Sequence, residues 1–426
     1  MKCKIFVFIF LFPLKSFGYN LNNILEMYQP IQTGTSTELV SYVKKNYRIP
    51  LSEHKLSKDH LENIKFWSDV YSLYDSSKIV IHSKADLGHI FKVVNLNRLY
   101  KKETNKIVAE IKKNKILRNE INKIKKEIKS CFKTKKYCKL QINKNISLKS
   151  YLKTLRTQTG QLDILQGGLI RFSNYEETIK NIIKITNSNE EWLAIPFLES
   201  SFNNKAISKV GATGAWQIMG HVGKKLMPIN RYVDTRRNPV IAAYAALKIL
   251  RENRIITKNS DIAVISYNSG LRNYFNLKNK IGARKLSTSQ YLSLSKKHNK
   301  LFSFASENFL LEYFAMIKFL KNNNILPFKN IKRRISSTSK IYEPYISRCK
   351  TRPSKVISLL SNHGENAKIF NNHFRLKSTE KVLPSGQIYL SNVKLPKRYY
   401  KKVKISNLDS MTPKKWRASY NNCSII

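Results

Sequence analysis

The sequence predicts a mainly α-helical protein with a basic helical N-terminal region, a helical central domain and a small C-terminal α/β module. Apolar residues recur at helical spacing in the first two parts, helix-capping residues punctuate the second, and strand-like segments occur near the C-terminus. A length of 426 residues exceeds one typical domain, and a hydrophobic content of 42% is enough for a sizeable core. The boundaries we expect are 1–18 for a signal peptide, 19–150, 151–328 and 329–426.

The N-terminal region shows its helical character most clearly in the segment "KILRNEINKIKKEIKS". Leu117, Ile121, Ile124 and Ile128 are separated by steps of four, three and four, which places them on one face of a helix. We interpret this face as a packing surface in preference to a dedicated partner-binding helix.

In the central domain, helix starts and stops are marked by residues with clear capping roles. Asn238 precedes Pro239, a favourable pair for an N-cap and a first helical position. A second helix is expected to begin with Ser260 or Asp261 as its cap and to stop at Gly270. Alternating strand patterns are not convincing here, so this part is expected to be helical.

After a polar, basic linker, the C-terminal part contains a helical segment, "PSKVISLLSNHG", and a strand-like segment, "GQIYLSNVKLP". Together they predict a small α/β module. The last segment of the chain is basic, with aromatic residues between the cations.

The charge is unusually one-sided, with 78 Lys and Arg against 27 Asp and Glu and a net charge of +51. Such a charge favours anionic polymers or surfaces, whether nucleic acid, lipid or bacterial wall. The chain is also rich in Lys, Asn and Ile throughout, and a nucleotide bias in the gene explains that composition equally well. No nucleic-acid-binding motif is recognisable, which disfavours that class of partner.

The first residues have the pattern of a secretory signal peptide. Lys2 and Lys4 precede an apolar run from Ile5 to Phe12, and small residues follow up to Gly18, after which cleavage is expected. Cys3 precedes the apolar run, so the pattern of a lipoprotein anchor is not met. We therefore expect an exported protein, periplasmic or secreted, that is soluble or held on a surface by charge.

Four further cysteines are compatible with disulfides in an oxidising compartment. Cys131 and Cys138 are close enough to close a small loop, and the pairing with Cys349 and Cys423 stays open. Zinc is disfavoured because no pair has CxxC spacing and no His lies nearby. We expect no metal and no cofactor.

One of the few acids, Glu199, stands at the end of an apolar run in "AIPFLESSFN". Phe197, Leu198 and Phe202 would remove water from its carboxyl group, which raises the pKa and keeps a proton available near neutral pH. A protonated carboxyl can act as a general acid on a leaving oxygen, as cleavage of a glycosidic bond requires.

Two further motifs carry side chains suited to an amino sugar. Gln217 in "GATGAWQIM" and Asn268 in "SYNSG" offer amide groups that could bind N-acetyl groups, and Tyr267 offers a ring face or a hydroxyl. Taken singly, each motif has an ordinary explanation: an exposed helix end, a packed Trp-Gln pair and a turn.

Taken together, in this order and spacing, these motifs resemble the catalytic domain of lytic transglycosylases. This is the soluble-lytic-transglycosylase fold related to goose-type lysozyme, and the branch with the greatest similarity is that of membrane-bound murein transglycosylase D. The resemblance covers about residues 155–325, from "RTQTGQLDILQGGLIRFSNYEETIKNI" through "LAIPFLESSFNNKAISKVGATGAWQIM" and "YVDTRRNPVIAAYAALKIL" to "AVISYNSG". It implies a lysozyme-like α-helical catalytic domain.

The resemblance also implies roles for single residues. Glu199 matches the catalytic acid/base of the family, and Ser200 beside it and the later Tyr313 are further candidates. The positions that match the sugar-binding site are Ser208, Gln217, Met219, Tyr267 and Asn268.

Two positions depart from the family pattern. Ser266 stands before the Tyr-Asn pair where the family usually has Ala, which is a mild change. Leu310 in "FASENFLLEYFAM" stands where the branch carries a tyrosine, and leucine lacks the aromatic ring for a late contact to the substrate. Tyr313, three residues on, is the candidate replacement.

The chemistry implied by the resemblance needs a single carboxylate. Glu199 would protonate the β-1,4 oxygen between MurNAc and GlcNAc and then accept the proton of the muramoyl C6 hydroxyl, giving a 1,6-anhydro end without water. Glycosidases commonly use two carboxylates, and Asp234 is the obvious second candidate. Its segment, "YVDTRRNP", matches a loop before a helix in the family, so a structural role is favoured.

Alternatives to this activity stay open at the level of the sequence. One Glu with a positioned water would give lysozyme-like hydrolysis, and a degenerate domain that binds peptidoglycan without cleaving it would retain the fold. The C-terminal part resembles, loosely, the LysM-like wall-binding pieces that follow this domain in related proteins. An unspecified basic accessory domain is the alternative.

Overall fold

The computed structural model describes residues 56–134, 147–297, 302–321, 341–361, 371–374, 379–383 and 387–405. The architecture is mainly α, as predicted, with two small antiparallel sheets. The expected signal peptide and the polar linker before 341 lie outside the described residues. Within the described part of the chain, no helix combines the length and the apolar character needed to cross a membrane.

The N-terminal region contains a three-stranded antiparallel sheet that apolar periodicity did not indicate. Its strands are β1 (Lys78–Ser83), β2 (Ile90–Asn95) and β3 (Leu155–Thr159), in the order β2-β1-β3. Ile79 and Ile81 of β1 pack toward the long helix, while Val80 belongs to the central core. Because β1 is covered on both faces, its apolar residues form a continuous run instead of alternating.

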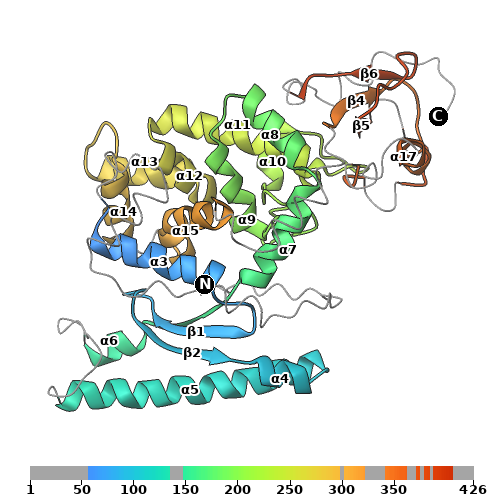
Figure 1. Ribbon diagram of the computed structural model, residues 1–426. Helices are drawn as coiled ribbons and strands as arrows, with labels where there is room; N and C mark the ends of the chain where they lie inside the picture. The colour runs from blue at the N-terminus through green and yellow to red at the C-terminus, as the bar shows by residue number, and fades with distance from the viewer. Residues whose placement is uncertain are drawn as a thin grey trace.

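That long helix is α5 (Lys106–Thr134), which runs along the side of the sheet away from the central helices (Figure 1). Ile124 and Ile128 are buried against the sheet, and Leu117 and Ile121 pack beside them. The predicted packing face is therefore confirmed. The short helices α4 (Asn97–Lys102) and α6 (Leu148–Leu152) lie next to α5.

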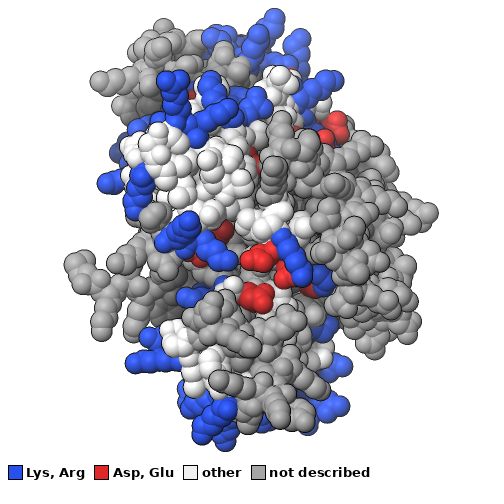
Figure 2. Space-filling model, turned by 90° about the vertical axis from the view of Figure 1, so that its left-hand side faces the viewer, with Lys and Arg blue, Asp and Glu red and all other residues white. Residues whose placement is uncertain are grey.

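The surface reflects the one-sided composition. Figure 2 shows one face on which Lys and Arg spread from end to end, while most of the acidic surface visible there lies near the middle. Lys115, Arg118, Lys126 and Lys129 are exposed on α5.

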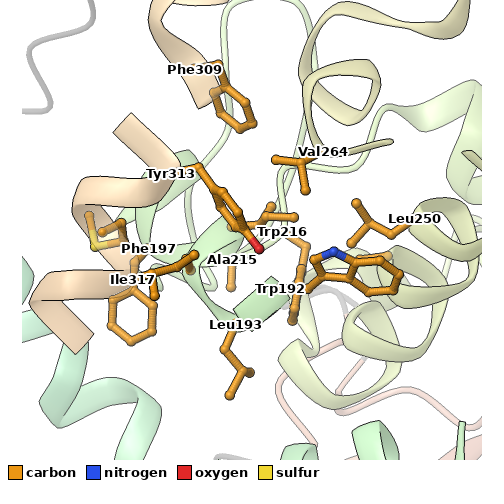
Figure 3. Packing of buried hydrophobic residues seen from close by; sticks show 14 of the residues in the cluster. Trp192, Leu193, Phe197, Ala215, Trp216, Leu250, Val264, Phe309, Tyr313 and Ile317 are labelled. Carbon is orange, nitrogen blue, oxygen red and sulfur yellow. The ribbon is translucent and has the colours of Figure 1, made fainter. Parts of the chain in front are cut away.

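The central helices share one hydrophobic core that begins before the expected boundary at 150. Helix α3 (Lys58–Ser72) packs along α15 (Phe304–Lys321), and its Trp67 and Tyr71 are buried in that core. Figure 3 shows the middle of the core, where Trp192, Trp216 and Tyr313 pack together. The other elements are α7 (Leu162–Ser173), α8 (Glu176–Ile185), η1 (Glu190–Leu193), α9 (Ala194–Ser200), α10 (Gly220–Leu226), η2 (Thr235–Arg237), α11 (Pro239–Thr257), α12 (Ser260–Ser269), α13 (Leu271–Lys280) and α14 (Thr288–Lys297).

The predicted helix ends are largely found. The Asn238 side chain accepts hydrogen bonds from the first backbone amides of α11, with Pro239 at the first position. Helix α12 is capped by Asn259, one residue before the expected Ser260, because the Asn259 side chain accepts bonds from the amides of Asp261 and Ile262. It stops at Gly270, whose φ is 80°.

The C-terminal module contains α17 (Pro353–Ser361) and a sheet of β4 (Glu343–Ser347), β5 (Ile388–Ser391) and β6 (Tyr400–Lys402), in the order β5-β4-β6. The helix and the strand predicted from the sequence are both present. His373 joins this module to the central domain: its carbonyl accepts from the Asp234 amide at 2.9 Å, and its Nδ1 accepts from Asn238 Nδ2 at 3.1 Å.

Two of the four cysteines discussed above, Cys131 and Cys349, lie among the described residues, and both form disulfides. The sequence was compatible with such bonds. Cys131 lies in the last turn of α5, and Cys349 follows β4 in the C-terminal module. Cys138 and Cys423 lie outside the described residues, so the predicted loop between Cys131 and Cys138 stays a prediction.

Acid is expected to destabilise the fold through two buried histidines. Burial lowers the pKa of His82 and of His373 from 6.5 to about 4. The unfolded chain takes up these protons at about pH 6.5 and the folded chain near pH 4, so the free energy of unfolding falls as the pH drops through this window. The loss is about 3 kcal/mol for each residue.

Urea unfolding at pH 7.0, 5.5 and 4.5 measures this loss. His373→Gln is expected to flatten the pH dependence, whereas His221→Gln, a substitution of an exposed histidine, leaves it unchanged. Equal slopes for the parent protein and His373→Gln would show that His373 does not carry the effect.

Candidate active site

Glu199 lies at the point where a buried helix ends and the backbone turns sharply. Helix α9 is apolar and buried from Ala194 to Phe197, and Glu199 is half-buried near its end. Ser201 and Phe202 follow with φ of 51° and 57°, the left-handed region that residues other than glycine seldom adopt. Two such residues in sequence indicate backbone strain next to the carboxylate.

Helix α7 holds this strained turn in place. The Arg171 guanidinium donates from Nη2 to the Ser201 carbonyl at 2.7 Å and from Nε to the Phe202 carbonyl at 3.1 Å. Gly168, one turn earlier, lets the two backbones approach, because a Cβ there would lie 2.6 Å from the Ser201 oxygen. The position of Glu199 therefore depends on a helix that precedes it by about thirty residues.

Arg171→Met is expected to destabilise the protein by about 2–4 kcal/mol, since two partly buried carbonyls lose a charged donor. Arg171→Lys should recover only part of this loss, because one ammonium group cannot replace the planar fork. Chemical denaturation measures both variants, with Arg272→Met on an exposed position as the control. If Arg171→Met loses no more unfolding free energy than Arg272→Met, the two hydrogen bonds from Arg171 do not stabilise the turn.

The environment of Glu199 shifts its titration toward neutrality. Burial raises the pKa of Glu199 to about 7, and a hydrogen bond from the Asn268 side chain opposes part of that rise. Phe197 and Phe202 are fully buried and pack with Phe172. The direction expected from the apolar neighbours is thus found, and Glu199 keeps its proton much of the time near pH 7.

The end of α12 supplies the second part of the site. The Tyr267 hydroxyl donates to the Trp216 carbonyl at 2.7 Å, and the charge of Glu199 adds to burial in raising the Tyr267 pKa. Asn268 Oδ1 accepts from the Ser306 hydroxyl at 3.2 Å, so its amide nitrogen is the end that faces Glu199. Ser306 of α15 therefore fixes the orientation of the Asn268 amide.

The segment from 206 to 219 supplies the third part. Gln217 has a φ of 47°, and its amide nitrogen donates to the Gly214 carbonyl at 2.8 Å. This bond fixes the side chain and leaves Oε1 as an acceptor. Ser200 Oγ donates to the Ala215 carbonyl at 2.9 Å and so joins α9 to this segment.

The remaining candidates of this segment have different positions. Ser208 Oγ accepts from the Ala212 amide at 2.9 Å and shapes the turn before Gln217. Met219 is half-buried at the start of α10, two residues beyond Gln217. Met219 is close to Gln217 in the chain, whereas Ser208 lies nine residues before it and supports the turn through its hydrogen bond from the Ala212 backbone.

Asp234 has a structural role in a buried ion pair. It is 4% exposed and pairs with Arg236, with Nη2–Oδ2 at 2.8 Å and Nε–Oδ1 at 2.9 Å. Arg236 also donates to the carbonyls of Gly211 and Ile218 at 2.9 and 3.1 Å. The pair braces the segment that carries Gln217, the structural role that the sequence favoured.

A different acid, Glu312 of α15, lies near Glu199. Burial and the charge of Glu199 raise the pKa of Glu312 to about 8, against a hydrogen bond from the Tyr71 hydroxyl at 3.3 Å. Neither Glu312 nor Ser306 was among the residues predicted from the sequence. The signal was present for Glu312, which stands within the apolar run "NFLLEYFAM" much as Glu199 stands within its own.

The late aromatic candidate does not join the site. Tyr313 is 3% exposed and points into the core beside Trp216 and Val264 (Figure 3). Leu310 is 1% exposed and belongs to the same core. The structure thus brings Glu199, Tyr267 and Asn268 together and leaves Tyr313 in the interior. Gln217 belongs to the segment whose Ala215 and Trp216 carbonyls accept from Ser200 and Tyr267.

Part of the central domain matches the sequence model of a known domain. Residues 178–289 match the family "Transglycosylase SLT domain". Glu199, Gln217, Tyr267 and Asn268 all lie within the matched segment. Tyr71, Ser306 and Glu312 lie outside it.

Among characterised proteins, the chain is similar to the membrane-bound lytic murein transglycosylase D of Escherichia coli (strain K12). The two are 32% identical over 103 residues, which is 24% of this chain and 23% of the relative. The protein of the same name from Escherichia coli O6:H1 (strain CFT073) gives the same figures. The match thus spans less than a quarter of the length of these relatives.

Proposed function

We propose that the protein is a peptidoglycan lytic transglycosylase that cleaves the β-1,4 bond between MurNAc and GlcNAc. The observation that carries the proposal is Glu199, a carboxyl group with a pKa raised to about 7 inside the segment that matches the SLT domain. A general acid works best when its pKa lies near the working pH.

The reaction uses Glu199 twice. Its proton passes to the bridging oxygen as the bond between this oxygen and the muramoyl C1 breaks, and the GlcNAc side leaves as an alcohol. The muramoyl C6 oxygen then bonds to C1, and its proton returns to the Glu199 carboxylate. The product is a 1,6-anhydro-MurNAc end, and no water is consumed.

The neighbouring side chains suit the sugar in this scheme. Gln217 Oε1 is an acceptor for an N-acetyl N–H, because the amide nitrogen of Gln217 is held by the backbone. Asn268 donates to Glu199 and stabilises its charged form, which exists between the two proton transfers. Tyr267 is tied to the Trp216 carbonyl and offers its ring beside the carboxylate.

Hydrolysis in the manner of a lysozyme is the second candidate, because Glu312 is a second carboxyl group close to Glu199. A two-carboxylate mechanism needs the second group ionised, as a base or a nucleophile. The pKa of Glu312, raised to about 8, keeps this group protonated at neutral pH. This favours formation of the anhydro end.

We also propose that the protein is exported and held on the wall of a cell. The signal-peptide pattern supports export to the periplasm or the exterior, and the net charge of +51 supports adhesion to an anionic wall or membrane surface. The C-terminal module adds a candidate wall-binding part. Elution of the protein from isolated walls by salt tests the electrostatic part of this proposal; retention at high salt would speak against it.

Digestion of purified peptidoglycan tests the activity. The products of the parent protein and of Glu199→Gln are separated, and their ends are identified by mass. Anhydro ends that are lost in Glu199→Gln support the proposal, and reducing ends would indicate hydrolysis. If neither protein releases fragments while both bind the wall, the chain is a binding protein.

A further inference from the structure

The mechanism above leaves Glu312 and Tyr71 without a role, although both are close to the site and both lie outside the matched segment. We infer that Glu312, held by Tyr71, forms a coupled carboxyl pair with Glu199 and acts as a positioning residue that retains the transferable proton. This inference rests on the proposed function for its catalytic meaning. Its physical content, the coupling of two carboxyl groups, does not depend on the reaction.

The geometry places Glu312 between two helices. Helix α15 packs against α9, which carries Glu199, and against α3, which carries Tyr71. Tyr71 is 2% exposed, stacks on Trp67 and donates its hydroxyl to Glu312 Oε2 at 3.3 Å. Because the phenol is fixed by packing, the carboxyl group that it bonds is fixed as well.

The charged groups on the helices packed against α15 are already paired or act on other residues, so the pKa of Glu312 responds mainly to burial, Tyr71 and Glu199. On α3, Asp69 is paired with Lys65 at 2.9 Å. On α12, the charge of Glu199 acts on Tyr267 and raises its pKa. Lys296 of α14 acts on Glu307, which lies in the first turn of α15, five residues before Glu312. The groups that shift Glu312 in the described structure are Tyr71 and Glu199, with no cation among them.

Electrostatic coupling acts in both directions. The charge of Glu199 disfavours ionisation of Glu312, so an ionised Glu312 must equally disfavour a charge on Glu199. The two carboxyl groups then lose their protons in two steps that belong to the pair. One proton stays on the pair to a higher pH than either group would hold it alone, and part of the time it is on Glu199.

This arrangement has a consequence for each half of the reaction. Below the first deprotonation step both carboxyl groups are protonated. Glu312 is then neutral, so it does not oppose the negative charge that Glu199 carries after donating its proton. Above the first step, when one proton remains, an ionised Glu312 favours the form in which Glu199 is ready to donate. The working pH range is therefore expected to extend upward.

Glu312→Gln tests the pair, since the amide keeps an acceptor for Tyr71 and cannot ionise. Its kcat/KM on peptidoglycan strands is expected to match the parent protein at pH 5.5 and to fall roughly threefold below it at pH 8. Tyr71→Phe removes the hydrogen bond that favours the ionised form of Glu312. The pair should therefore lose its second proton at a higher pH than in the parent protein. Glu307→Gln, the same change on the same helix, is the control and should leave the profile unchanged.

Carbon-13 NMR of glutamate-labelled protein gives a readout that is independent of activity. In the parent protein the Glu199 carboxyl carbon should titrate in two steps, and in Glu312→Gln in one. A single step in both, with superimposable pH profiles, would overturn the inference. If Glu199 titrates in two steps but the protein cleaves no glycan strand, the carboxyl pair is supported and the proposed function is refuted. If Glu312→Gln does not fold, the test is the Tyr71→Phe variant. An upward shift in the pH of its second deprotonation step supports the pair, and an unchanged titration refutes it.

Discussion

Glu199→Gln is expected to lower the rate of strand cleavage by about a hundred- to ten-thousand-fold, the usual contribution of a general acid. Gln cannot donate a proton to the bridging oxygen or accept one from the C6 hydroxyl, so both halves of the reaction lose their catalyst. The change is nearly isosteric, and Asn268 keeps a hydrogen-bond partner at this position. Release of anhydro-ended fragments over time measures the loss.

The pH profile of the parent protein provides an independent check. Because Glu199 must be protonated to begin the reaction, and its pKa is about 7, the rate should decline at alkaline pH. Thermal unfolding of Glu199→Gln serves as the control and should show a stability equal to or above that of the parent, since a buried charge is removed. A rate within tenfold of the parent would assign the chemistry to another group.

Gly214→Ala is expected to cost about 3 kcal/mol or more of unfolding free energy and to displace Gln217. Gly214 has a φ of 82°, and a Cβ there would lie 1.8 Å from the Arg236 carbonyl oxygen, so the backbone of one segment must move. The cost combines a left-handed conformation with a clash against backbone. Urea unfolding measures the stability, and strand cleavage reports on the displaced site.

Gly211→Ala separates these two causes. Gly211 has nearly the same φ, 85°, and nothing within 4 Å of the position of an added Cβ. Its substitution should cost only about 1–2 kcal/mol, the price of the left-handed conformation. Equal losses for the two variants would show that the close approach to Arg236 contributes nothing.

Much of the central domain could be predicted because its determinants are local. Asn238 and Pro239 define the start of α11 through bonds within a few residues, and Gly270 ends α12 in the same way. The apolar neighbours of Glu199 are adjacent in the chain, so the direction of its pKa shift followed from the sequence. The same local signals placed α17 and β5.

Other features could not be predicted, since they depend on contacts between distant segments. The strand β1 is covered on both faces, by α5 and by the central core, and this removes the alternation that would reveal it. The boundary expected at 150 does not separate the cores, because α3 packs along α15. Tyr313 was a candidate for the sugar site, and packing places it in the interior.

The sequence by itself determined the mainly α fold, the acid Glu199 and the motifs that accompany it, because each depends on residue type and short spacing. Only the tertiary structure decided which acid stands beside Glu199. Asp234 is bound to Arg236, while Glu312, 113 residues after Glu199 in the chain, shares its electrostatic environment. The physical reason is that charge coupling and desolvation depend on distance in space, which the packing of α15 between α3 and α9 sets.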